Sequence, residues 1–193
     1  MSYAVAISRE DRAEGFLYLT GFMLCIPVAN WMIGHVGTVC APDGPCMIPV
    51  APGLLAPSGV VTAGLALVLR DLVQRRLGRL WSLGAIAAGS VLSAALATGT
   101  LVVASSAAFF LSELADFAVY TPLQRRRFIL AVIASSAAGL VVDSVLFLGL
   151  AFGSLDFLSG QIVGKAWMVL ASLPFIWWLR ARDRRRLAGG ARG

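Results

Sequence analysis

Long apolar stretches separated by short polar connections run along the whole chain. A bilayer crossing needs about 20 mostly apolar residues, and helices satisfy their own backbone hydrogen bonds in hydrocarbon, whereas an open sheet does not. The pattern therefore predicts an all-α membrane protein, a single bundle of six transmembrane helices. The six segments span residues 15–34, 58–74, 80–98, 100–122, 128–152 and 157–179.

Composition supports this interpretation. Hydrophobic residues make up 59% of the 193 residues and charged residues only 13%, whereas a soluble domain carries about 25% charged residues. Almost nothing remains for a soluble domain. We expect a tail over 1–14, a transmembrane transporter domain over 15–179 and a basic tail over 180–193.

The arginines indicate the orientation in the membrane. They follow the second, fourth and sixth segments, whereas the connections at 35–57, 98–100 and 153–156 contain no Lys or Arg. By the positive-inside rule this asymmetry places both termini in the cytoplasm. The net charge of +6 is thus explained by arginines beside a membrane, and we expect no nucleic acid as a partner. The polar N-terminal residues lack the basic region and cleavage site of a signal peptide, so the first segment should be retained.

The longest connection, 35–57, holds Cys40 and Cys46 in a Pro- and Gly-rich stretch that could fold back toward the membrane. An oxidising exterior permits a disulfide between them, and two free thiols are the alternative, since geometry decides. No spacing resembles a metal site and no Walker motif occurs, so we expect neither a metal nor a cofactor.

Four charged residues lie inside apolar segments: Glu113, Asp116, Asp143 and Lys165. A charge at the bilayer centre costs at least about 2.5–3.5 kcal/mol, and such residues usually face a bundle interior. Helical spacing places Asp116 on one face of its segment with Phe109, and Glu113 lies beside that face. Gln161 and Lys165 share a face of the last segment. The spacing predicts a polar pocket near the middle of the membrane.

The alternative interpretation is a structural ion pair of Lys165 with Asp143 or Glu113. One such pair would leave surplus acceptors among the acids, unless Arg70 reaches inward or an acid is protonated. Surplus acceptors favour a ligand that supplies N–H groups. We expect Arg70 and Asp71 at the cytoplasmic boundary, where Arg70 can snorkel toward water.

Several motifs together resemble the queuosine precursor transporter family, also called the VUT family. The resemblance extends over about 52–179 and rests on Leu69-Arg70-Asp71-Leu72-Val73, the run from Ala104 to Tyr120, the run from Val142 to Phe147, and Gly164-Lys165. It implies a six-helix inner-membrane importer of deazaguanine bases such as preQ0 and preQ1, which feed queuosine synthesis in tRNA.

The polar residues that match the family's membrane motifs are Arg70, Asp71, Glu113, Asp116, Asp143 and Lys165. Their individual roles are our own inference. We expect Phe109 to stack on the base, Glu113 or Asp143 to accept its N–H groups, and Lys165 or Gln161 to donate to its carbonyl. Arg70 and Asp71 would form an inner gate. Asp116 completes the expected substrate site.

Other functions are compatible with parts of the pattern. A substrate-binding subunit of an energy-coupling-factor transporter would have this size, and its ATPases would be separate chains. An intramembrane enzyme is disfavoured, because the only histidine lies in a loop and no Gly-x-Ser-x-Gly motif occurs. A scaffold without transport activity is a third interpretation. The sequence leaves a homo-oligomer and the source of energy open.

Overall fold

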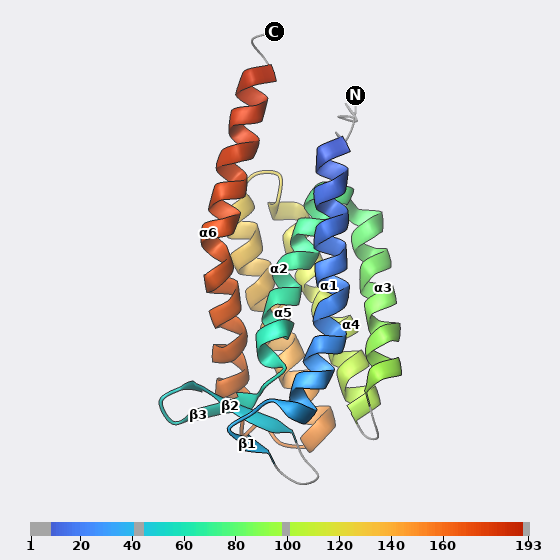
Figure 1. Cartoon of the computed structure of the whole chain (residues 1–193), viewed down its shortest axis with the longest axis vertical. Coiled ribbons are helices and arrows are strands. Elements are labelled where there is room, and N and C mark those ends of the chain that lie inside the picture. The colour runs from blue at the N-terminus through green and yellow to red at the C-terminus, as the bar shows by residue number, and fades with distance from the viewer. Residues whose placement is uncertain (1–8, 41–44, 98–100, 191–193) are drawn as a thin grey trace.

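The computed structural model describes residues 9–40, 45–97 and 101–190. Within these ranges the chain forms six helices and one small sheet (Figure 1). The helices are α1 (Arg9–His35), α2 (Val60–Leu77), α3 (Arg79–Leu96), α4 (Leu101–Leu123), α5 (Phe128–Phe152) and α6 (Leu158–Gly190). Five of them, all but α2, are long and apolar enough to cross a membrane.

Helix α2 falls outside that group because its second half is polar. Arg70, Asp71 and Gln74 all lie on it, and each is buried against neighbouring helices. The surrounding helices therefore supply the hydrogen-bonding and charged partners that lipid tails lack. The sequence-based segment over 58–74 is extended here to Leu77.

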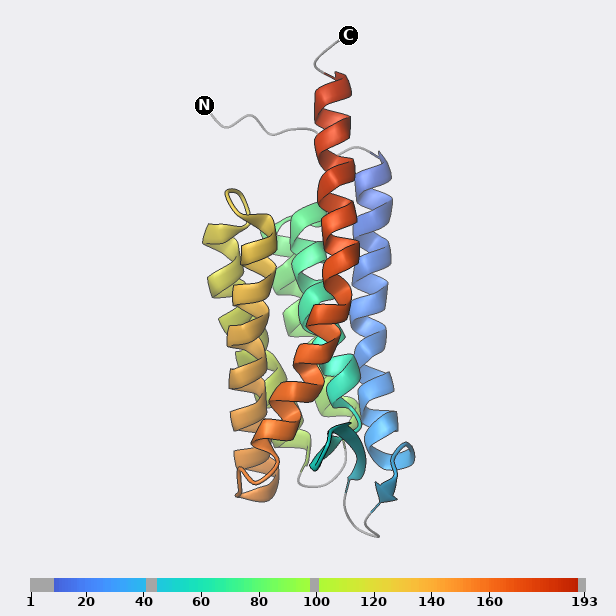
Figure 2. The same ribbon diagram turned by 90° about the vertical axis from the view of Figure 1, so that its left-hand side faces the viewer.

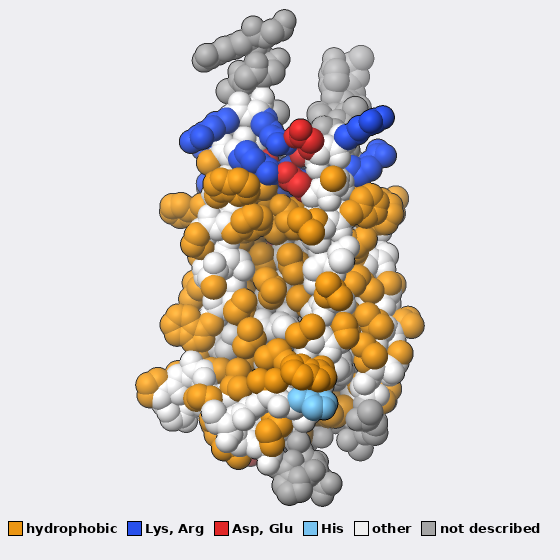
Figure 3. Space-filling model, viewed as in Figure 1, with side chains coloured by type: hydrophobic (Ala, Val, Ile, Leu, Met, Phe, Trp, Pro, Cys, Tyr) orange, Lys and Arg blue, Asp and Glu red, His pale blue; other side chains and the backbone are white. Residues whose placement is uncertain are grey.

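The two ends of the bundle differ in character. In both ribbon views the start of α1 and the end of α6 lie at one end, and the strands lie at the other (Figures 1 and 2). We call the first the basic end, because arginine side chains gather there around a few carboxylates (Figure 3). We call the other the sheet end.

Ion pairs tie three helices together at the basic end. Arg76 of α2 contacts Glu14 of α1 at 3.0 Å and Asp183 of α6 at 2.7 Å, and Arg182 contacts Glu14 at 2.5 Å. Residues 9–14 and 180–190, which we had expected to belong to tails, are thus helical, and Glu14 and Asp183 in these parts join α1 and α6 to α2.

The connection after α1 forms a sheet rather than a segment that re-enters the bundle. Strands β1 (Val39–Cys40), β2 (Cys46–Ala51) and β3 (Leu54–Pro57) pair antiparallel in that order. Gly53 has a φ of 74° in the turn between β2 and β3, a conformation that glycine adopts without a Cβ penalty. An all-α fold class was therefore incomplete.

The sheet is fastened to itself and to the bundle. Cys40 and Cys46 are paired across β1 and β2 and are joined by a disulfide, the first of the two alternatives given above. The indole N–H of Trp167 in α6 donates to the carbonyl of Val50 at 3.0 Å, and the Ser58 hydroxyl donates to the carbonyl of Met32 at 2.7 Å. The sheet thus covers one end of the helix bundle.

Gly64 lets α2 approach α6 at the level of Lys165. A Cβ added at Gly64 would lie 2.5 Å from the carbonyl oxygen of Lys165, and that backbone cannot move without shifting α6. We expect Gly64→Ala to lower the free energy of unfolding by about 1–3 kcal/mol, the usual cost of overpacking. The measurement is thermal unfolding of the purified protein in detergent.

Gly84→Ala is the matched control. Nothing lies within 4 Å of a Cβ added there, and alanine has the higher helix propensity. Gly84→Ala should leave the unfolding temperature unchanged or raise it. Equal behaviour of the two variants would contradict the close approach at Gly64.

Candidate functional site

A cavity of about 100 Å³ lies inside the half of the bundle nearest the sheet. Its wall includes Pro57 and Gly59 beside the sheet, Asn30 and Ile33 from the end of α1, and Gln161 from the start of α6. Toward the basic end it reaches Glu113 of α4. The cavity is therefore formed by segments from most of the chain rather than by one motif.

Five of the six residues predicted to bind substrate line this cavity. They come from three helices: Phe109 and Glu113 from α4, Asp143 from α5, and Gln161 and Lys165 from α6. Asp116, the sixth, does not line it and lies one turn further along α4. The ionisable groups of three helices thus converge on one hollow.

Lys165 is held by a complete set of acceptors although its side chain is fully buried. Its ammonium lies 2.6 Å from Asp143 Oδ2 and donates to Ser144 Oγ at 2.8 Å and to Gln161 Oε1. The structural ion pair considered from the sequence is therefore present, with Asp143 as the partner. The pair lies on the cavity wall, and a ligand would reach the ammonium by replacing one of these three acceptors.

Phe109 is fixed against its neighbours on the cavity wall. Its ring packs on Phe22 of α1 with centroids 5.8 Å apart. A Cβ added at Gly89 of α3 would lie 2.8 Å from the Phe109 ring, so this glycine makes room for it. An aromatic surface is thereby placed beside Glu113, one helical turn away.

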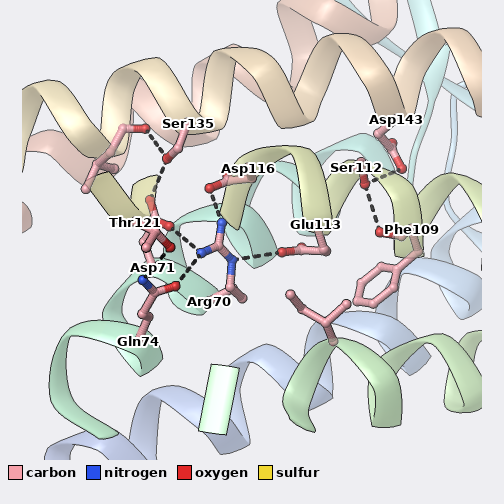
Figure 4. A network of polar contacts seen from close by, with 12 residues as sticks. Arg70, Asp71, Gln74, Phe109, Ser112, Glu113, Asp116, Thr121, Ser135 and Asp143 are labelled. Atoms are coloured by element: carbon pink, nitrogen blue, oxygen red, sulfur yellow. Dashed lines mark hydrogen bonds and ion pairs between the residues drawn. The ribbon is translucent and has the colours of Figure 1, made fainter. Parts of the chain in front are cut away.

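Arg70 is the centre of a buried polar network (Figure 4). Its Nε donates to Glu113 Oε2 at 3.2 Å, its Nη2 donates to Asp116 Oδ1, and its Nη1 lies 3.0 Å from Asp71 Oδ1. Nη1 also donates to Gln74 Oε1 at 3.3 Å. One guanidinium therefore serves three carboxylates from two helices, a geometry for which its fork of donors is suited.

This network corrects our expectation for Arg70 and Asp71. Neither side chain is exposed at all, so Arg70 does not snorkel to a boundary. The reason is that α2 continues for two more turns and is surrounded by neighbouring helices. Arg70 reaches inward and takes up acceptors that the sequence argument had assigned to a ligand.

The sequence analysis missed the residues that hold this network in place. Ser135 of α5 donates to Asp71 Oδ2 at 2.8 Å, and the amide of Gln74 donates to Thr121 Oγ1 at 3.0 Å. Gln74 lies four residues after Arg70, a spacing that brings two side chains together on a helix. That spacing was a usable signal, whereas the contacts to Ser135 and Thr121 depend on packing.

Apolar side chains are buried beside the Arg70 network. Leu72, Val73, Tyr120, Val132 and Ile176 belong to one cluster of buried residues. Along α2, Arg76 with its ion pairs follows this stretch and lies at the basic end. The cavity wall, the Arg70 network and the ion pairs of Arg76 are therefore met in this order from the sheet end to the basic end.

Residues 59–179, more than half of the chain, match the model of a family described as "Putative vitamin uptake transporter". The match covers α2 to α5 and most of α6, and so includes the Arg70 network and most of the cavity wall. No significant match was found among curated proteins or among solved structures.

Proposed function

We propose, from the premise that this chain belongs to the family of vitamin uptake transporters, that it imports the deazaguanine bases preQ0 and preQ1. These bases would supply the queuosine modification of tRNA. The observation that carries the proposal is the convergence of Phe109, Glu113, Asp143, Gln161 and Lys165 on one cavity inside a membrane bundle. The motifs shared with queuosine precursor transporters favour a deazaguanine among small heterocycles.

The proposed binding mode follows the chemistry of the cavity wall. Guanine-like bases present neighbouring N–H groups along one edge, and a carboxylate accepts two such bonds at once. Glu113 accepts from this edge, Phe109 stacks on the flat ring, and Lys165 or Gln161 donates to the ring carbonyl. Asp143 keeps Lys165 oriented through its ion pair of 2.6 Å.

The proposed topology has six spans with both termini in the cytoplasm of a bacterial-type inner membrane. Support comes from the basic end, where Arg75, Arg76, Arg182 and Arg186 lie together with the start of α1 and the end of α6. Helix α2 is the sixth span, because its polar residues are enclosed by the others. The cavity would then be nearer the outer face.

The inner gate in this proposal comprises Arg70 with Asp71, as expected from the resemblance. Their network lies between the cavity and the basic end, and it binds α2 to α4. Alternating access to a site at the middle of the membrane would require these contacts to separate. Asp116 acts in the gate rather than on the base, since it lies behind the cavity wall.

The printed description of the family favours a second candidate, uptake of a vitamin. The same cavity would suit another flat heterocycle with N–H donors. Such a protein could act as the substrate-binding subunit of an energy-coupling-factor transporter, with ATPase partners supplied by other chains. Copurification of ATPase subunits after mild solubilisation would favour this candidate.

The test of the import proposal uses a host that neither makes deazaguanines nor has its own importer. Expression of this chain should restore queuosine in tRNA when preQ0 or preQ1 is supplied. Glu113→Gln should lower uptake at least about tenfold, equivalent to about 1.4 kcal/mol. The carboxylate of Glu113 accepts hydrogen bonds with both oxygens, whereas the amide of glutamine has one acceptor and one donor. Its NH2 group would face an N–H group of the base, and no hydrogen bond forms between two donors. Queuosine is measured in purified tRNA by mass spectrometry.

Immunoblots of the membrane fraction provide the control for insertion, and Arg79→Gln, an exposed position at the start of α3, is the matched variant. Arg79→Gln should keep wild-type uptake. Normal uptake by an inserted Glu113→Gln variant would contradict the binding role of Glu113. A failure of the wild-type chain to restore queuosine would contradict the import proposal itself.

A further inference from the structure

Asp71 of α2 and Asp116 of α4 bring two carboxylates onto one guanidinium in the interior of the bundle. Both side chains are completely buried: Asp71 Oδ1 lies 3.0 Å from Arg70 Nη1, and Arg70 Nη2 donates to Asp116 Oδ1. Gly139 of α5 makes room for this arrangement, because a Cβ added there would lie 3.1 Å from Asp116 Cβ. Two carboxylates therefore share one site closed to water.

One oxygen of each aspartate accepts no hydrogen bond. Among the described residues, Asp71 Oδ1 and Asp116 Oδ2 are buried and lack a hydrogen-bond donor, although Asp71 Oδ1 forms an ion pair with Arg70. An ionised carboxylate has only acceptors, so two of them cannot bond to each other. A buried polar group without a partner is unfavourable, because it has lost the water that would bond to it. A single proton on one carboxylate would give the pair the donor that two ionised carboxylates lack.

Charge counting shows independently that this part of the bundle has more carboxylates than cations. The cavity and the Arg70 network contain four carboxylates, those of Asp71, Glu113, Asp116 and Asp143, against the cations Arg70 and Lys165 within the described chain. Lys165 is taken by Asp143. Arg70 thus faces three carboxylates alone, and each uncompensated buried ion costs several kcal/mol.

Other titratable groups surround the pair on every side that packs against it. Glu113 lies on the same helix as Asp116, one turn toward the cavity, and Tyr120 lies one turn toward the basic end. Within the described ranges, the titratable groups near the pair or near the residues around it include Cys25 from α1, Arg70 and Arg75 from α2, Glu113 and Tyr120 from α4, Asp143 from α5 and Lys165 from α6. Arg70 is the cation of this set that contacts both aspartates.

We propose that Asp71 and Asp116 form a proton-binding site that holds one exchangeable proton shared by their two carboxylates. On loading, a hydronium ion transfers its proton: one of its O–H bonds breaks, a new O–H bond forms on one carboxylate, and a water molecule is left. On release the carboxylic O–H bond breaks, a water molecule takes up the proton as hydronium, and the pair becomes one unit more negative. Because both side chains are fully buried here, exchange requires the helices around the pair to separate.

Arg70 connects this proton site to the cavity. Its Nε donates to Glu113 Oε2 on the cavity wall, while its Nη atoms contact the aspartates. A ligand that binds the Glu113 carboxylate competes with Arg70 Nε for it. Arg70 then interacts more strongly with Asp71 and Asp116, which changes the affinity of the two aspartates for their proton. Coupling of a proton to substrate movement rests on the proposed function, whereas the proton site itself does not.

Infrared spectroscopy of the purified protein in lipid nanodiscs tests the proton site without any substrate. Wild-type protein should show the carbonyl band of a protonated carboxylic acid at neutral pH. Asp71→Asn and Asp116→Asn should each lose that band, and both should fold because an asparagine amide can donate to the remaining carboxylate. Asp143→Asn, whose carboxylate is paired with Lys165, is the matched control and should keep the band.

Absence of the band from wild-type protein would overturn the proposal. So would a band that persists in both variants, or one that disappears only in Glu113→Gln. Each variant is compared at equal amounts of protein that elutes as a single species on size exclusion.

Proteoliposomes that enclose a pH-sensitive dye test the coupling. Addition of preQ1 should acidify the lumen as the base enters, and collapse of an imposed pH gradient should abolish accumulation above the external concentration. Entry of preQ1 without a lumenal pH change would overturn the coupling. If preQ1 does not enter at all, the proposed function fails, while the infrared result still decides the proton site.

Discussion

Replacing Arg70 with glutamine should lower the free energy of unfolding by about 3–5 kcal/mol, the usual loss when one partner of a buried ion pair is removed. The reason is that Asp71, Glu113 and Asp116 would remain buried without their cation. Thermal unfolding of detergent-purified protein gives the size of the effect, and the amount in the membrane fraction gives its consequence in cells.

Two further variants make the Arg70 prediction specific. Arg70→Lys keeps the charge but loses the fork that reaches three carboxylates, so its loss should be smaller but measurable. Arg79→Gln removes an exposed arginine, and surface substitutions usually change stability by less than about 0.5 kcal/mol. Equal losses in Arg70→Gln and Arg79→Gln would contradict the central role of the network.

Replacing Lys165 with methionine should lower uptake of preQ1 at least about tenfold, equivalent to about 1.4 kcal/mol of binding. Lys165 is the cation among the described residues that line the cavity. Its removal takes away a donor for the base carbonyl and leaves Asp143 without its partner at 2.6 Å. Uptake of radiolabelled base by cells is measured beside the amount of inserted protein.

A double variant separates the structural role of Lys165 from its role toward a ligand. Lys165→Met with Asp143→Asn removes both charges, so insertion should recover relative to the single variant. Uptake should stay low, because the donor is still missing. Recovery of wild-type uptake in the double variant would mean that the pair acts only in packing. Ser144→Ala removes one acceptor of Lys165 and should keep most of the uptake.

The helices were predictable because a long run of apolar residues can be recognised from neighbouring positions in the sequence alone. Apolar segments over 128–152 and 157–179 correspond closely to α5 and to the start of α6. The connection at 98–100, expected between the third and fourth segments, lies outside the described residues. Helix α2 was predicted from the apolar segment over 58–74, although its polar second half leaves it outside the helices that are apolar enough to span a membrane.

The sheet was missed because its signals are weak in sequence. Strand β2 contains Pro49, and β1 has only two residues. Proline and glycine in this connection were read as loop residues, whereas Pro52 and Gly53 mark the turn between β2 and β3. The sheet is also held by contacts with α6, such as the hydrogen bond from Trp167 to Val50. Residues this far apart in the chain do not appear together in the periodicity of one segment.

The sequence by itself determined which residues have to avoid lipid. Helical periodicity put Phe109, Glu113 and Asp116 on or beside one face of a single helix, and the cost of a charge in hydrocarbon required that face to point inward. Both arguments need only neighbours in the chain. They therefore predicted five residues of the cavity wall without any knowledge of the packing.

Only the tertiary structure determined which charged side chains form ion pairs with each other. Arg70 and Asp116 are 46 positions apart, and Lys165 and Asp143 lie on different helices. Their pairing depends on how closely α2 approaches α6 at Gly64 and α5 approaches α4 at Gly139. The depth of Arg70 depends in turn on the helices that enclose α2. These distances between helices result from the packing of the whole bundle, so no single segment of the sequence contains them.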